Sequence, residues 1–86
     1  MRDLVELLVK ALVSDPDQVR VTELDDGGDT VLEVRVADDD LGRVIGRDGR
    51  VANAIRTVAK AAATADDGGR VMVEIVEADR ARPRAD

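Results

Sequence analysis

The stretch VIGRDGR, residues 44–50, decides the fold and the expected function of this chain. Two glycines stand three positions apart with arginines beside them, and a long helical pattern begins directly after the second glycine. A short loop of this kind presents main-chain N–H groups to a phosphate, and the helix N-terminus behind it adds partial positive charge. Glycine has no Cβ atom, so another backbone can approach closely. The segment therefore predicts a loop that binds phosphate groups.

Helical patterns lie on both sides of this loop. We expect one of the aspartates at positions 38–40 to cap a short helix over residues 40–45, because adjacent acids on a loop do not converge on a cation. A longer helix is predicted from Arg50 to Ala65. Its apolar stripe comprises Val51, Ala54, Ile55, Val58, Ala61, Ala62 and Ala65, and its polar residues occupy the opposite side.

The N-terminal segment predicts another helix over residues 3–14. Asp3 and Glu6 have the spacing of a capping box, and Pro16 ends the pattern. One apolar row comprises Leu4, Leu8, Ala11 and Leu12, and a second comprises Val5, Val9 and Val13. Two interpretations of the valine row stay open: a deeply packed helix, or a surface for a partner protein or a second copy.

Alternating apolar residues predict three strands, near residues 19–24, 32–36 and 71–76. The acidic, glycine-containing turn at 25–29 should join the first two strands as an antiparallel hairpin, and residues 66–69 form another turn. Residues 78–86 have no apolar period and are expected to be a disordered tail after a domain of residues 1–77. The order predicts an α+β domain with helices on one face of a three-stranded sheet.

Composition excludes several classes of function. The 86 residues contain no cysteine and no histidine, which removes disulfides, thiol chemistry and the usual transition-metal ligands and nucleophile–base pairs. No Gly-Lys-Ser/Thr sequence completes a Walker loop, so we expect no enzyme, no cofactor and no metal. No apolar run is long enough to span a membrane and no signal peptide is recognisable, so a cytoplasmic protein is expected.

Charge is segregated along the chain. Residues 41–65 hold five basic residues and one acidic residue, a local charge of +4, within a chain of net charge −6. A basic face on an acidic body directs a polyanion to one site. The chain also has no aromatic residue, so bases could not be held by stacking on Phe, Tyr or Trp.

The helix–G-x-x-G–helix unit, and above all residues 41–63, resembles the KH domain. The order of the predicted elements resembles the type II form of that fold (α-β-β-α-α-β). This order and the length of the chain are similar to those of the KhpA family of small stand-alone bacterial KH-domain RNA-binding proteins. The resemblance, from about residue 2 to residue 77, implies single-stranded RNA as the ligand and a post-transcriptional regulator or RNA chaperone linked to cell shape. It also implies a possible homodimer, or a heterodimer with a larger KH-domain protein, with RNA binding then secondary.

Site residues follow from the same resemblance. The loop would clamp the RNA backbone through its two glycines and through Arg47 and Arg50, while Asp48 departs from the basic or neutral residue usual there and should weaken binding. Asp48 would either point to solvent or pair with a neighbouring arginine. The bases would lie on Leu41, Val44 and Ile45, with Leu32, Val34 and Val36 as candidates for the sheet side. The complete set of expected RNA-binding residues is Leu41, Arg43, Val44, Ile45, Gly46, Arg47, Asp48, Gly49, Arg50 and Asn53.

Overall fold

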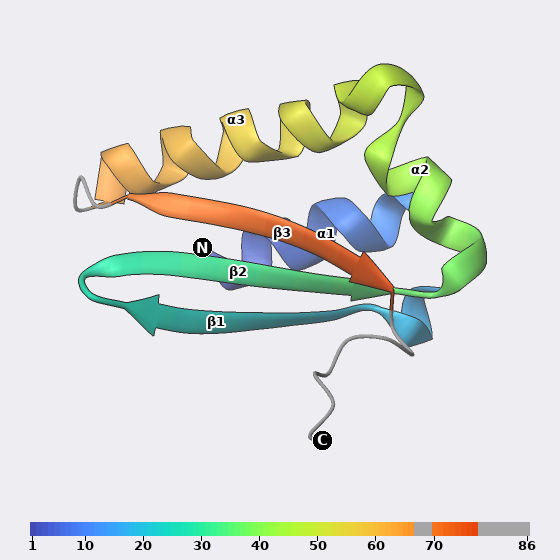
Figure 1. Ribbon diagram of the computed structural model, residues 1–86, viewed down its shortest axis with the longest axis horizontal. Helices are drawn as coiled ribbons and strands as arrows, with labels where there is room; N and C mark the ends of the chain where they lie inside the picture. The colour runs from blue at the N-terminus through green and yellow to red at the C-terminus, as the bar shows by residue number, and fades with distance from the viewer. Residues whose placement is uncertain (67–69, 78–86) are drawn as a thin grey trace.

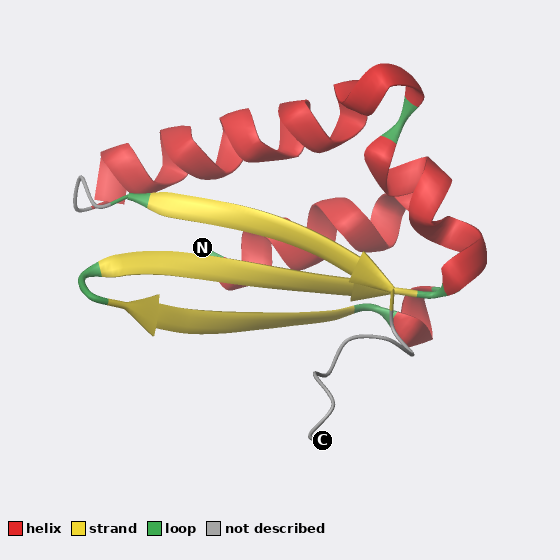
Figure 2. Cartoon of the chain, in the orientation of Figure 1, coloured by secondary structure: helices red, strands yellow, loops and turns green. Residues whose placement is uncertain are grey.

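The computed structural model describes residues 1–66 and 70–77 of the chain. Three helices and three strands follow one another in the order α-β-β-α-α-β, as Figures 1 and 2 show. This order confirms the predicted fold. The elements are α1 (Arg2–Leu12), β1 (Arg20–Asp26), β2 (Asp29–Val36), α2 (Leu41–Ile45), α3 (Arg50–Asp66) and β3 (Val71–Glu77). The predicted disordered tail lies outside the described residues.

The sheet is mixed, with β2 in the centre. β1 pairs with β2 in antiparallel register, with Val21 opposite Val34. β3 pairs with β2 in parallel register, with Ile75 opposite the same Val34. A parallel neighbour requires a crossover connection, and α2 and α3 provide it. The loop between these two helices therefore lies at the turning point of the crossover, at the upper right of Figure 1.

One hydrophobic core lies between the sheet and the helices. Alternate residues of each strand point into it, and Leu32, Val34 and Val36 of β2 are fully buried. Because every second side chain of a strand shares a face, this pattern confirms the predicted alternation. The other core residues are Val5, Val9, Val19, Val21, Val44, Ile55, Ala59, Ala63, Val71 and Val73.

Of the two apolar rows predicted on helix α1, the valine row is the more deeply buried. Val5 and Val9 have no exposed surface, whereas Leu7 is 66% exposed and Leu12 is 38% exposed. The valine row therefore belongs to the core, and the interpretation of that row as a partner surface is wrong. Leu7 and Leu12 are left at the surface, and Leu4 and Leu8 are half-buried.

The predicted stripe of α3 is displaced from the buried one. Its buried residues are Ala52, Ile55, Ala59 and Ala63, whereas Ala54, Ala61 and Ala65 are exposed and Val58 is 40% exposed. Small alanines against the sheet let the helix approach it closely. Both helices thus bury rows of smaller side chains than expected, and some of their apolar side chains are exposed to solvent.

The predicted capping box at the start of α1 is also wrong. Met1 is the N-cap residue and no side chain caps the helix. Glu6 instead pairs with Arg2 and Lys10, each 3.0 Å away on the same helix. Spacings of four residues place these side chains on adjacent turns, so the carboxylate is held along the helix and does not return to its first N–H groups.

Candidate nucleic-acid interface

The two glycines of the loop between α2 and α3 have different structural roles. Gly46 has φ +78° and ψ 173°, a conformation that is open almost only to glycine. A Cβ atom there would overlap Cγ2 of Val51 and would lie 2.8 Å from the main-chain N of Val51. Gly49 also has a positive φ, +76°, but a Cβ atom there would meet nothing within 4 Å. Gly46 therefore closes the loop onto α3, and Gly49 leaves open space on its outer side.

Two of the main-chain amides of the loop close the loop itself. The amide of Gly46 donates to Gly42 O at 2.8 Å, and that of Gly49 donates to Gly46 O at 3.2 Å. The amides of Arg47 and Asp48 lie between these two, at the tip of the loop, and donate to no side chain of the described residues. Successive N–H groups next to a left-handed residue form a concave anion site, and Asp48 has that conformation, with φ 57° and ψ 25°.

Charged side chains surround these amides. Arg47 and Arg50 are exposed and form no ion pair with any described residue. Asp48 is likewise exposed and unpaired within residues 1–66 and 70–77. Of the two predicted arrangements of Asp48, the solvent-facing one is thus observed. Aspartate tolerates the left-handed conformation better than most residues, which gives a conformational reason for an acid at this position.

Asp40 connects the start of α2 to the segment after α1, and it does not act as the predicted helix cap. Its carboxylate is fully buried and makes no capping hydrogen bond to α2. It accepts the amide of Ser14 at 2.9 Å, the hydroxyl of Ser14 at 2.8 Å and the amide of Asp15 at 3.1 Å. The Ser14 amide is the main reason why the pKa of Asp40 lies below its usual value. These bonds tie the start of α2 to the segment that follows α1.

Arg43 extends the same contact outward. Its Nε lies 3.3 Å from Oδ1 of Asp40, and its side chain is 60% exposed. Only Nε contacts the carboxylate, so the outer part of the guanidinium keeps its access to solvent on the side of α2. The position is compatible with the expected contact to a phosphate.

Apolar side chains near the loop are fewer than the sequence suggests. Ile45 is 39% exposed, and Leu41 is half-buried against the core. Val44 is fully buried, so it fixes α2 to the core and has no surface for a base. The expected sheet side, Leu32, Val34 and Val36, is fully buried as well, since these side chains lie beneath the helices. The accessible apolar surface at the loop thus reduces to Ile45 and part of Leu41.

The polar side of α3 continues from the loop toward β3. Asn53 is exposed and its Oδ1 accepts Nη1 of Arg56 at 3.2 Å. Nε of Arg56 donates to Val73 O at the free edge of β3, at 3.3 Å. Between α3 and this edge lies a cleft of about 290 Å³. Its residues were not among those expected from the sequence, although the basic composition of residues 41–65 included Arg56.

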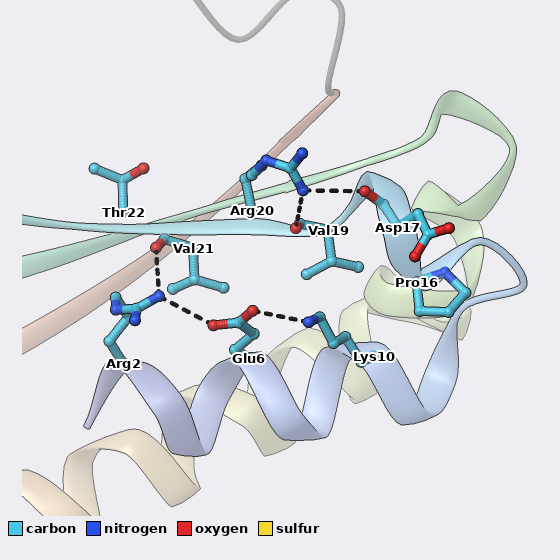
Figure 3. A pocket seen from close by; sticks show the side chains of 9 residues that line it. All are labelled: Arg2, Glu6, Lys10, Pro16, Asp17, Val19, Arg20, Val21 and Thr22. Carbon is cyan, nitrogen blue, oxygen red and sulfur yellow. Dashed lines mark hydrogen bonds and ion pairs between the residues drawn. The ribbon is translucent and has the colours of Figure 1, made fainter.

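A second cleft, of about 440 Å³, lies at the opposite edge of the sheet between α1 and β1. Figure 3 shows that its cations are held by the protein itself: Arg2 and Lys10 pair with Glu6, and Arg20 donates to two main-chain oxygens. The hydrogen bond from Lys10 is the main cause that lowers the pKa of Glu6. This cleft therefore offers less free positive charge than the loop.

Two further features bear on the class of site. Among the described residues, no three acidic, histidine or cysteine side chains are grouped so that they could hold a metal ion. No helix of residues 1–66 has the length and apolar character that crossing a membrane would require.

Comparison with known proteins agrees with this geometry. The family model described as "KhpA/KhpB, KH domain" matches residues 2–75. The "RNA-binding protein KhpA" of Clostridium acetobutylicum is 49% identical over 88% of this chain and 100% of its own length. The proteins of the same name from Streptomyces coelicolor (47% identity, 95% of this chain, 99% of that protein) and Leifsonia xyli subsp. xyli (51%, 81% and 88%) are also similar. No solved structure matches significantly. The chain therefore belongs to the KhpA/KhpB family of KH domains.

Proposed function

We propose that this chain is a non-catalytic protein that binds single-stranded RNA through the loop of residues 46–49. The observation that carries the proposal is the left-handed turn at Asp48, flanked by Arg47 and Arg50, which are exposed and form no ion pair with a described residue. The relatives are named RNA-binding proteins, which supports the same ligand. In this proposal the protein acts in the cytoplasm as a post-transcriptional regulator or RNA chaperone, with no cofactor.

The contacts divide between backbone and bases. A phosphate oxygen accepts the amides of Arg47 and Asp48, and the guanidiniums of Arg47 and Arg50 pair with the same or adjacent phosphates. Open space outside Gly49 lets the sugar–phosphate strand approach. The bases rest on Ile45 and the accessible part of Leu41, without aromatic stacking, so sequence selectivity is low.

The experiment measures the anisotropy of a labelled single-stranded RNA during titration with protein. Replacing both Arg47 and Arg50 by glutamine should weaken binding. The slope of the logarithm of the binding constant against the logarithm of the salt concentration should become shallower by about 0.7 for each phosphate contact that is lost. The matched control replaces Arg2 and Lys10 by glutamine, which removes the same charge from α1, beside the edge of β1. Equal losses in the two double variants would mean that the loop is not the site.

Self-association is a second candidate function, favoured by the exposed apolar side chains of α1 and α3. The polar side of α1 faces the edge of β1, and Arg56 of α3 reaches the edge of β3. The remaining sides, with Leu7 on α1 and Val58 on α3, therefore share the outer surface of the helical layer. Exposed alanines on α3 would let the same helix of a second copy approach closely, as a symmetric dimer requires.

Sedimentation of the wild-type protein and of Val58→Glu tests this candidate. The wild-type protein should form a dimer that dissociates on dilution, and Val58→Glu should be a monomer with an unchanged circular dichroism spectrum. If the wild-type protein stays monomeric at high concentration but forms a complex with a larger KH-domain protein, the functional complex is the heterodimer and not the homodimer. A monomer that forms neither complex would remove the candidate function altogether.

A further inference from the structure

The edge of β1 that faces away from β2 has no partner strand among the described residues. Two hydrogen bonds show which way the main chain of this segment points. Val21 O accepts Nη1 of Arg2 at 3.4 Å, and Val19 O accepts Nη1 of Arg20 at 2.9 Å. These bonds, drawn in Figure 3, come from arginine side chains and not from β2, so the two carbonyls point away from the sheet.

Every second residue of β1 directs its main chain to this open edge. In an antiparallel pair the N–H and C=O of one residue point to the same side, and the side alternates along the strand. Val21 therefore presents both groups outward, and so do Glu23 and Asp25. The neighbouring strand agrees with this assignment, because Thr30 lies opposite Asp25 and its amide donates to Arg70 O, on the side of β3. The edge thus offers donors and acceptors at three alternate positions.

The side chains along this edge change in charge from one end to the other. Glu23 and Asp25 are exposed and form no ion pair within residues 1–66 and 70–77. They share a face of the sheet with Val21, which is buried in the core beneath the helices. Beside Val21 begins the cleft of about 440 Å³ between α1 and β1, and Arg2 is one of its lining residues. The edge therefore presents two carboxylates and then a guanidinium.

The charges at this edge select among the segments that can pair with it. Charged side chains on an edge strand oppose pairing with apolar or like-charged segments. A segment with opposite charges at the matching positions instead gains a cross-strand ion pair at each of them. Arg2 does not close the edge, because its bond to Val21 O is long and its ion pairs with Asp3 and Glu6 lie at the surface, where such pairs are weak.

We propose that the free edge of β1 binds an extended segment of a partner protein, which adds to the sheet as an antiparallel strand. Two basic side chains, at alternate positions of the segment, lie opposite Asp25 and Glu23, and an acidic side chain two positions further lies beside Arg2. Main-chain hydrogen bonds supply the affinity and the charges supply the selectivity. A second copy of β1 does not meet this requirement, since it adds two more carboxylates to the edge. RNA is a polyanion and is repelled by the same two acids.

The test uses two synthetic peptides, acetylated and amidated, that differ at two positions. One is Thr-Lys-Val-Lys-Thr-Glu-Thr and the other is Thr-Glu-Val-Glu-Thr-Glu-Thr. Titration of the isotope-labelled full chain with the lysine peptide should move the amides of Val21, Glu23 and Asp25. The lysine peptide should bind about tenfold more tightly than the glutamate peptide, for two cross-strand charge pairs. The variant Glu23→Lys with Asp25→Lys changes only exposed side chains and should reverse this preference.

Main-chain pairing has its own matched control. The N–H of the second lysine of the peptide faces β1 opposite Glu23, so a methyl group on that nitrogen should abolish binding. The N–H of the next threonine points away from β1, so a methyl group there should leave the affinity unchanged.

Several results would overturn the proposal. They are the absence of shifts in β1 at millimolar lysine peptide, equal affinities of the two peptides for the wild-type chain, and equal effects of the two methyl groups. Shifts of the β1 amides with protein concentration alone would show that the occupant is a second copy. None of these measurements includes RNA, so a failure of RNA binding at the loop would leave the result at β1 unaffected.

Discussion

Replacing Gly46 by alanine should destabilise the domain much more than the same replacement at Gly49. At Gly46 the backbone conformation itself costs about 1–3 kcal/mol for a residue with a Cβ atom. The new methyl group also collides with Val51, where a main-chain N only 2.8 Å away belongs to α3 and cannot rotate aside. Overpacking of this kind adds about 1–3 kcal/mol, so the total loss is about 2–6 kcal/mol. At Gly49 only the positive φ opposes alanine, at about 1–2 kcal/mol.

Urea denaturation followed by circular dichroism measures both losses. A double-mutant cycle with Val51→Ala separates the two causes at Gly46, because alanine at 51 removes the Cγ2 overlap but keeps the backbone contact. The coupling should be favourable by about 1 kcal/mol, and part of the Gly46→Ala loss should persist. Equal destabilisation at positions 46 and 49 would refute this account of the loop. The same reasoning makes Gly46 unsuitable for testing RNA binding, since a folding defect would imitate a binding defect.

Three other predictions follow from the structure. Val5→Ala should cost about 2 kcal/mol in urea denaturation and Leu7→Ala less than about 0.5 kcal/mol, because the first is buried and the second exposed; the reverse order would contradict the observed core. The pKa of Asp40 is lower in the folded protein than its usual 3.8, so its carboxylate stabilises the fold above that pH and the contribution is lost as the pH falls toward the folded-state pKa. Asp40→Asn should therefore flatten the decline of Tm in acid, and an unchanged profile would exclude Asp40 as its cause. Asp48→Asn keeps the left-handed backbone accessible but removes a charge near the phosphate, so RNA should bind about fivefold more tightly at low salt, as anisotropy would measure; weaker binding would show that the carboxylate assists.

Local patterns were sufficient to predict the order of the elements. Alternation in β2 and the glycine pair of the loop depend on neighbouring residues only, and the structure reproduces both. The buried row of each long helix could not be predicted in this way. On α1 the buried residues are Val5 and Val9 while the larger Leu7 is exposed, and this choice depends on how the helix packs on the sheet. On α3 the buried side is mostly alanine, with Ile55, while Val58 is 40% exposed. The sequence therefore left open which of the two apolar rows of α1 is buried, and on α3 it predicted a stripe that is displaced from the buried one.

The site was predictable in part for the same reason. The loop residues are contiguous, so their spacing indicated the turn. Asp40 was taken as a local cap because the sequence does not reveal Ser14, whose amide and hydroxyl donate to it across 26 positions. The contact between Arg56 and Val73 also joins distant segments, and it is visible only once β3 is known to be an edge strand. Val44 was counted with the base-contacting residues because its burial depends on the packing of α2.

The most direct test of the RNA site is a titration of isotope-labelled protein with a short single-stranded oligoribonucleotide, followed by amide chemical shifts. The largest changes should occur at the amides of Arg47 and Asp48, since these groups lie at the tip of the loop and would bind the phosphate. The amides of β1, such as Thr22, should not move. Shifts that gather on β1 or on the outer face of the sheet, with the loop unchanged, would contradict the proposed function.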